Sequence, residues 1–476
     1  MASSRLGSVV VLAVVALMLS VTVGAARARA LGSYTVTVTA TTDGTTEQTI
    51  GANEGCARFD VNDLVDAGFT NYRIYAGMSR LEPQDDDGTF GSPSIAQIET
   101  GGPSTINWTQ WQAQFTRPDG YFWSGCSPTP PAQVSLQDML TALQSKGIRP
   151  VVVLRNVDNN GNPAWAQQLN PPSTAAGQNE WWEFVYAWVY YADVTLGLGI
   201  DDWEVHNEPD NSGQGWGGTE QDYLSFTRLT ADAIHWVYSH YLPGRTPRVY
   251  APVSTHANNW ISDSLQANDD VIDVVDWHRY GPPLSEAQTI QGWISQYNSD
   301  GVHEPLMLSE WGSYRNAYGL GDGLNYAGYL MDHNVDGGRV DESSVFPMYD
   351  WTSRMTGLVH GDGSRAPAYY AFRLMNRGLN GGKTQYVVTT TIPGNVNLRA
   401  FAAKDANGTV WTELLNQSAQ TQTITLDLSA LGKTTGTVTF HEYSAAHLDE
   451  ATGTATLAGG TVTFSVPKNA IVQVQA

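Results

Sequence analysis

The sequence predicts an α/β protein: a (β/α)8 TIM barrel followed by a C-terminal antiparallel β-sandwich domain. Eight short apolar strands, mostly separated by amphipathic helices, follow one another from Ile50 to about residue 350. No glycine-rich nucleotide turn follows the first strand, which disfavours a doubly wound open sheet, the competing arrangement. From Gly382 onward the helical periodicity disappears and alternating strands replace it.

Residues 1–30 have the features of a secretory signal peptide. Arg5 supplies the positive charge, Val9–Val23 is an apolar run, and Ala28-Arg29-Ala30 has the small-x-small form of a cleavage site. An uncleaved anchor is the alternative, although the run is short for a membrane span. We therefore expect a secreted, extracellular protein with no membrane contact after cleavage.

The mature chain is too long for one ordinary core, so two domains are expected. Residues 31–47 form one alternating Thr/Val strand that we expect to join the sandwich. Residues 48–381 form the barrel and residues 382–476 the sandwich, with no Pro/Ser linker between them.

The barrel strands are short apolar runs, of which Pro150–Arg155 is continuous, as expected for a strand buried on both faces. The predicted strands are Gln48–Ala52, Asn71–Tyr75, Pro150–Arg155, Trp203–His206, Arg248–Ala251, Val274–His278, Leu306–Glu310 and Ser344–Met348. Ser135 and Thr219 are expected to cap two of the intervening helices. The predicted sandwich strands are Gln385–Thr391, Val396–Ala402, Val410–Leu415, Gln422–Leu428, Thr437–Tyr443, Thr461–Val466 and Ala470–Val474.

Composition points to an uncharged partner. The formal charge is −22, and removal of the signal, which holds three arginines and no acids, makes the mature chain more acidic still. Such a field repels nucleic acid and anionic membranes. Charged residues are only 15% of the chain, whereas aromatics reach 11%. Neutral oligo- or polysaccharides suit this balance, because sugar C–H faces pack on aromatic rings while hydroxyls form hydrogen bonds.

The chain has two cysteines, Cys56 and Cys126, and neither lies in a redox or zinc spacing. Because export places them in an oxidising compartment, we expect a disulfide between them, with two free thiols as the alternative.

Two glutamates stand at the ends of predicted strands. Asn207 and Glu208 follow the fourth strand, and Glu310 closes the seventh. The C-terminal ends of barrel strands carry the functional residues, so both carboxyls share one mouth. Other predicted strand ends contribute polar and aromatic side chains, namely Arg73, Arg155, Asn156, His256, His278, Tyr280, Tyr349, Asp350 and Trp351.

Cleavage of an acetal link between sugars requires two carboxyls, one to protonate the leaving oxygen and one to attack the anomeric carbon. A salt bridge is the simpler explanation for either glutamate alone. Two strand-terminal glutamates inside an aromatic-lined ring favour catalysis. No HExxH motif or paired spacing accompanies His206 and His278, so no metal or other cofactor is predicted.

Asn207-Glu208-Pro209 after a Trp-Glu-Val strand, with Ser309-Glu310-Trp311-Gly312 on the seventh strand, resembles the clan A retaining glycoside hydrolases over residues 48–380. Segments 203–210 and 357–372 look most like glycoside hydrolase family 39, with family 5-like and family 30-like members as alternatives. In these enzymes the acid/base closes strand four and the nucleophile closes strand seven. The resemblance implies double displacement, with Glu208 as acid/base and Glu310 as nucleophile.

The resemblance also implies roles for neighbouring residues. Asn207 is similar to the amide that holds the sugar 2-hydroxyl, and Arg73 and Tyr280 are similar to groups that keep the nucleophile ionised. The candidate substrate-binding residues are Arg73, Asn156, Asn207, His278, Tyr280 and Trp351. A non-catalytic carbohydrate-binding protein on the same barrel is the alternative function, and the presence of both glutamates favours the hydrolase.

Overall fold

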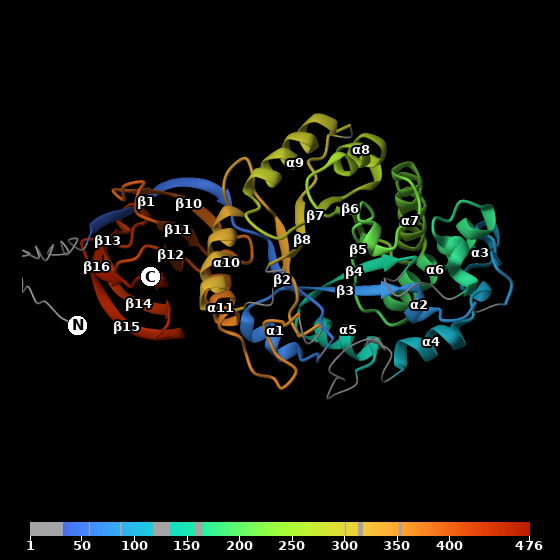
Figure 1. Cartoon of the computed structure of the whole chain (residues 1–476), viewed down its shortest axis with the longest axis horizontal. Coiled ribbons are helices and arrows are strands. Elements are labelled where there is room, and N and C mark those ends of the chain that lie inside the picture. Colours follow the sequence, from blue (N-terminus) through green and yellow to red (C-terminus); the bar gives the residue numbers. More distant parts are fainter. Residues whose placement is uncertain are drawn as a thin grey trace, which may run out of the picture.

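The protein is described from a computed structural model covering residues 32–476 apart from 57, 86–87, 118–133, 158–163, 300, 313–317 and 352–354. The predicted signal peptide and Cys126 lie outside these residues. The chain forms two closed sheets that lie side by side, with two helices between them (Figure 1). We call the first sheet with its helices the α/β barrel and the second sheet the β domain.

The α/β barrel has eight parallel strands in the order β2 to β9, and β9 closes the sheet by pairing with β2. The strands are almost entirely buried, because helices cover the outside and side chains fill the inside. They are β2 (Thr49–Asn53), β3 (Asn71–Gly77), β4 (Arg149–Arg155), β5 (Asp202–Val205), β6 (Arg248–Ser254), β7 (Val274–Arg279), β8 (Leu306–Trp311) and β9 (Glu342–Val345). The predicted barrel is confirmed.

Helices follow most strands, and two of them start at the predicted caps. Ser135 accepts from the backbone of Asp138, and Thr219 forms a capping box with Asp222. The helices are α1 (Val61–Ala67), α2 (Met78–Leu81), α3 (Ile95–Gly101), α4 (Trp108–Thr116), α5 (Leu136–Ser145), α6 (Ala175–Val189), α7 (Glu220–Tyr241), α8 (Asn259–Asn268), α9 (Leu284–Tyr297), α10 (Leu320–Asp332) and α11 (Pro367–Leu379).

The β domain is a closed sheet of nine strands that contains both β1 and the C-terminus. β1 pairs antiparallel with β10 and parallel with β13, so the sheet has one parallel pair in an otherwise antiparallel arrangement. The strands are β1 (Ser33–Thr45), β10 (Thr384–Thr390), β11 (Leu398–Lys404), β12 (Val410–Asn416), β13 (Gln422–Asp427), β14 (Thr435–Tyr443), β15 (Leu448–Ala458), β16 (Thr461–Val466) and β17 (Ala470–Gln475).

Helices α10 and α11 join the two parts (Figure 1). Asp449 of β15 is fully buried as a side chain and accepts from Arg373 and Arg377 of α11 at 2.6 Å each. Phe401, Leu415 and other β-domain side chains belong to the same hydrophobic cluster as the α/β barrel core. The two parts therefore form one packed body.

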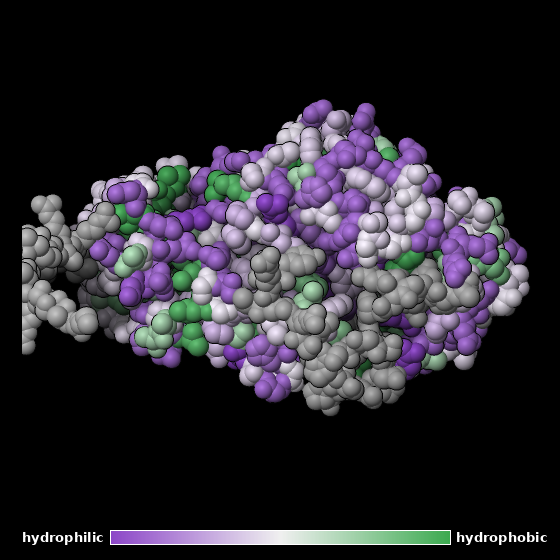
Figure 2. All heavy atoms as spheres, in the orientation of Figure 1, coloured by the Kyte–Doolittle hydropathy of each residue, from purple (hydrophilic) through white to green (hydrophobic). Residues whose placement is uncertain are grey.

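Hydrophilic residues predominate on the face shown in Figure 2, and the hydrophobic groups on it are small and separate. None of the helices among the described residues has the length and apolar character needed to cross a membrane.

Candidate active site

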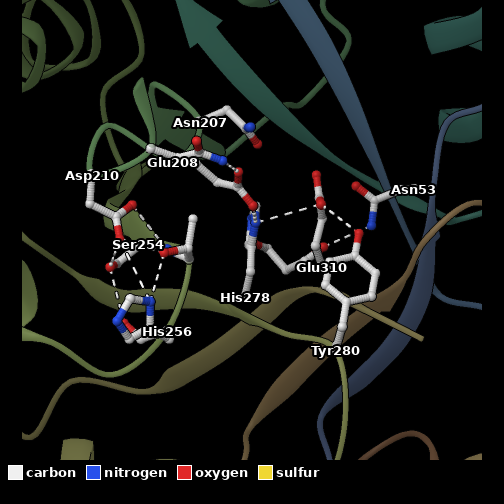
Figure 3. A network of polar contacts seen from close by, with 12 residues as sticks. Asn53, Asn207, Glu208, Asp210, Ser254, His256, His278, Tyr280 and Glu310 are labelled. Carbon is white, nitrogen blue, oxygen red and sulfur yellow. Dashed lines mark hydrogen bonds and ion pairs between the residues drawn. The ribbon is translucent and has the colours of Figure 1, made fainter. Parts of the chain in front are cut away.

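The predicted site residues lie at the C-terminal end of the α/β barrel strands, around Glu208 and Glu310 (Figure 3). Glu208 follows β5, His278 is on β7, Tyr280 follows β7 and Glu310 is on β8. Parallel strands bring these ends together because their C-termini all lie at the same edge of the barrel.

The backbone that carries Glu208 is held in an uncommon conformation. β5 ends at Val205, one residue before the predicted end, and His206 and Glu208 have φ angles of 68° and 46°. A positive φ in a non-glycine residue costs roughly 1–3 kcal/mol. The Glu208 N–H donates to the carbonyl of Val253 at 3.0 Å, which holds this turn against β6.

The Glu208 carboxyl makes two hydrogen bonds through different oxygens. Oε1 lies 2.8 Å from Nδ1 of His278, and Oε2 accepts from Nδ2 of Asn211 at 2.8 Å. The amide of Asn211 is oriented by its own oxygen, which accepts from the N–H of Gly213. This side chain is therefore fixed at the mouth with one oxygen facing His278.

Glu310 is surrounded by donors. Arg73 donates to Oε1 at 2.9 Å, the hydroxyl of Tyr75 donates to the same oxygen, and Tyr280 donates to Oε2 at 2.9 Å. Burial alone raises the pKa of this carboxyl, but the charges of His278 and Arg73 and the two tyrosine hydrogen bonds outweigh burial and lower the pKa. Glu310 is thereby kept ionised at neutral pH.

Arg73 is fully buried and connects the site to a deeper layer. Its guanidinium contacts Glu204 through Nε and Nη2, and it also donates to Asn207 Oδ1 at 2.7 Å and Asn53 Oδ1 at 2.8 Å. Glu204, deeper in the barrel, neutralises the charge of Arg73, while Glu310, at the mouth, accepts a hydrogen bond from it. The result is a rigid guanidinium beneath the mouth.

His278 lies between the two glutamates, with Nδ1 2.8 Å from Glu208 and 3.5 Å from Glu310. Burial lowers the pKa of this imidazole, yet the charge of Glu310 and the contact with Glu208 raise it overall. Ligand atoms of Glu208, His278 and Glu310 all lie within 4.8 Å of one another. The two carboxyls are therefore close enough for one small reacting group.

These three side chains form the only set among the described residues with metal-ligand spacing. Arg73 places a fixed positive charge on Glu310, and two tyrosine hydroxyls already occupy its oxygens. A divalent cation would displace these donors and be repelled by the arginine. The donor set therefore fits an anionic carboxylate that attacks carbon better than it fits a metal ligand.

The other predicted residues are placed as follows. Trp351 lies edge-on to Tyr75 with ring centroids 6.0 Å apart, which puts it beside the Glu310 hydrogen-bond network. Asn156 is fully buried and donates to the carbonyl of Leu169, so its amide fixes the chain after β4 and a contact with sugar stays a prediction. Cys56 is buried after β2, and its predicted partner Cys126 is outside the described residues.

Sequence reasoning missed Asn53, Tyr75, Asn211 and Asp276. Tyr75 stands two residues after Arg73 on the same strand, and the period of two places both side chains on one face. Asp276 stands two residues before His278 by the same rule, and burial together with the charge of Glu204 raises its pKa well above the usual range. A search along the inward face of each strand would have found both.

No protein-family model and no curated protein matches the chain. Solved structures do match it. A glucosidase from Croceicoccus marinus has a TM-score of 0.67 and 14% identity, covering 93% of this chain and 98% of the glucosidase. A family 30 endoxylanase from Clostridium papyrosolvens has a TM-score of 0.63 and 17% identity, covering 94% of this chain and 100% of the endoxylanase.

The glycoside hydrolase family 39 enzyme from Xanthomonas axonopodis pv. citri has a TM-score of 0.60 and 16% identity, covering 93% of this chain and 96% of that enzyme. The fold of this chain is thus that of the clan A glycoside hydrolases, with family 39 among its structural neighbours. These alignments cover nearly the whole chain, so they confirm its architecture, a TIM barrel with an attached β domain.

Proposed function

We propose that the protein is a secreted retaining O-glycoside hydrolase that cleaves a neutral oligo- or polysaccharide, or its side chains, by double displacement. The observation that carries the proposal is the asymmetric pair of carboxyls. Glu310 is surrounded by a cation and hydroxyl donors, while Glu208 lies within 4.8 Å of it without a direct arginine contact among the described ion pairs. A short separation suits direct attack by a carboxylate rather than attack by an intervening water.

In the first step Glu310 attacks the anomeric carbon and the bond from that carbon to the leaving oxygen breaks. The electron pair stays on the leaving oxygen, which takes a proton from Glu208. Asn207, held by Arg73 through its Oδ1, keeps Nδ2 available to donate to a sugar hydroxyl beside the nucleophile. The product is a glycosyl ester on Glu310 and a free leaving group.

In the second step Glu208, now ionised, accepts a proton from water as the water oxygen attacks the anomeric carbon. The ester bond breaks and Glu310 recovers its negative charge, which Arg73, Tyr75 and Tyr280 stabilise. Two inversions at one carbon give net retention of configuration. The negative charge is on Glu310 before the first step and on Glu208 after it. His278 Nδ1 lies within reach of both carboxyls and can interact with whichever of them is ionised.

Export and a disulfide between Cys56 and Cys126 belong to the same proposal. The apolar leader and its cleavage motif support export, and oxidising compartments allow disulfides. The names of the structural neighbours, a glucosidase and an endoxylanase among them, support a carbohydrate substrate.

The test is turnover of a panel of 4-nitrophenyl glycosides, arabinans, xylans, galactans and β-glucans by the full mature chain. We expect hydrolysis of at least one substrate, and proton NMR of the first-formed sugar should show the anomer of the substrate. Binding without turnover across the whole panel would support the non-catalytic carbohydrate-binding protein. Turnover with inversion would contradict the assignment of Glu310 as nucleophile.

A further inference from the structure

A segment beside Glu208 is held in place by one buried carboxylate. Asp210 accepts from Ser254 Oγ at 3.0 Å, from the N–H and hydroxyl of Thr255 at 3.0 and 2.6 Å, and from Asn258 Nδ2 at 2.7 Å. Only 4% of its side chain is exposed. Because Asp210 is two residues after Glu208, residues 254–258 are fixed relative to the acid/base.

This network also orients the imidazole of His256. The single hydroxyl proton of Thr255 is donated to Asp210, so Thr255 Oγ1 acts as the acceptor in its 2.8 Å contact with Nδ1 of His256. Nδ1 therefore carries a proton. The opposite nitrogen, Nε2, makes no hydrogen bond with any side chain that the structure describes, and 55% of the His256 side chain is exposed.

The position of His256 relates it to the direction of the substrate. Figure 3 shows Glu310 on one side of Glu208, with His256 and Asp210 on the other. In the proposed reaction the anomeric carbon lies at Glu310 and the leaving oxygen lies at Glu208. A substrate that extends from Glu310 past Glu208 therefore places its leaving group on the side of His256.

We propose that His256 belongs to the leaving-group subsite, where its Nε2 accepts a hydrogen bond from a hydroxyl of the departing sugar. In the neutral ring with the proton on Nδ1, Nε2 is an acceptor for a sugar hydroxyl. The orientation fixed by Thr255 and Asp210 lowers the entropic cost of this hydrogen bond. This inference rests on the proposed hydrolase activity and adds a residue that binds the departing sugar.

The experiment compares two substrates with the same glycon. One is the 4-nitrophenyl glycoside that the wild-type protein hydrolyses, and the other is the corresponding disaccharide. His256→Ala should lower kcat/KM for the disaccharide by about three- to tenfold, the value of one neutral hydrogen bond, and change the 4-nitrophenyl value by less than twofold. His256→Gln keeps an acceptor in reach and should recover part of the loss.

A matched control is His303→Ala, because His303 is also exposed but precedes β8, at the opposite end of the barrel strands. It should leave both substrates unchanged. Equal effects of His256→Ala on the two substrates, or no effect on either, would overturn the leaving-group subsite. Failure of the proposed function looks different, since the wild-type protein would then hydrolyse neither substrate.

Discussion

Glu310 in the α/β barrel and Glu413 in the β domain invite comparison, because each is a glutamate on a strand of a closed sheet. Both side chains are buried, with Glu413 fully inaccessible and Glu310 only 6% exposed as a residue. Their environments differ. Arg73, Tyr75 and Tyr280 donate to Glu310, whereas Gln473 donates to Glu413 Oε1 at 2.7 Å. Glu413 Oε2 has no hydrogen-bond partner among the residues that the structure describes.

The two carboxyls respond in opposite directions. Burial raises the pKa of Glu413 to about 8, with the hydrogen bond from Gln473 only partly opposing it. The pKa of Glu310 is lowered despite burial, because a buried cation and hydroxyl donors stabilise its charged form. Burial alone therefore produces a protonated acid at neutral pH, and a nucleophile requires charge-stabilising partners fixed in place.

The largest expected effect concerns catalysis by these two residues. Glu310→Ala removes the attacking carboxylate and should lower kcat by at least ~10⁴-fold, whereas Glu413→Gln should leave kcat within twofold. Added azide should restore turnover of Glu310→Ala by attacking from the vacated face. The product, identified by NMR, should be the glycosyl azide of inverted configuration.

An azide product of retained configuration from Glu310→Ala would contradict the nucleophile assignment. A large loss of activity in a correctly folded Glu413→Gln protein would contradict the view that only the glutamate of the α/β barrel acts in catalysis and that the glutamate of the β domain does not. Circular dichroism of both variants is the control for folding.

The next effect concerns Glu208, the partner carboxyl. Glu208→Ala removes the proton donor, so kcat/KM should fall by ~10²–10⁴-fold for substrates with poor leaving groups. Aryl glycosides with activated leaving groups need little protonation and should still form the glycosyl ester. A series of substituted phenyl glycosides measures this dependence on the leaving group. Azide should then release the ester as a glycosyl azide of retained configuration, which NMR identifies.

If Glu208→Ala and Glu310→Ala show the same dependence on the leaving group, the two roles are wrongly assigned. Asp405→Ala is a suitable matched control, since Asp405 organises a turn in the β domain by accepting from the N–H groups of Asn407 and Thr409.

Stability should depend on pH through Glu413. Its folded pKa of about 8 lies above the ordinary value of 4.5, so the folded state holds the proton more tightly than the unfolded state. The resulting stability is fully present below pH 4.5 and is lost as the pH rises through 8. Glu413→Gln should come within about 1 kcal/mol of the wild type at pH 5 and exceed it at pH 9 by up to ~5 kcal/mol.

Urea unfolding at both pH values measures this difference in the free energy of unfolding. Residues that titrate in both proteins cancel in the comparison. If Glu413→Gln is less stable than the wild type by the same amount at pH 5 and pH 9, Glu413 is ionised in the folded protein and its pKa is not raised.

The barrel and the principal site residues could be predicted because both depend on strand ends. Glu208, Glu310 and Tyr280 each stand at or near the end of an apolar run, and parallel strands bring such ends to one edge. Arg73 lies in the middle of β3 and reaches Glu310 from deeper in the barrel. This logic required no knowledge of distances.

Features that depend on register or on weakly apolar segments were not predicted. β15 (Leu448–Ala458) has mostly exposed side chains, so it lacks the apolar alternation by which the other β-domain strands were recognised. The contacts of Asp210 with residues 254–258 join segments more than forty residues apart, and no local pattern reports such pairing. The left-handed turn at Glu208 was also hidden, because non-glycine residues rarely adopt it.

The smallest effect tests a single donor in the Glu310 network. Tyr280→Phe removes the hydroxyl that donates to Glu310 Oε2, so the charged form loses a stabilising hydrogen bond and the pKa of Glu310 should rise. Since Glu310 must be ionised to attack, activity should be lost at a higher pH on the acid side. A hydrogen bond to a charged group is worth about 1.5–3 kcal/mol, which moves the acid limb of kcat/KM upward by about 1–2 pH units.

Tyr443→Phe is the matched control, because this hydroxyl donates to the neutral carbonyl of Leu320 where the β domain meets α10. Tyr443→Phe should lower the melting temperature slightly and leave the acid limb in place. An unchanged acid limb in Tyr280→Phe would mean that Arg73 and Tyr75 alone hold the charge on Glu310.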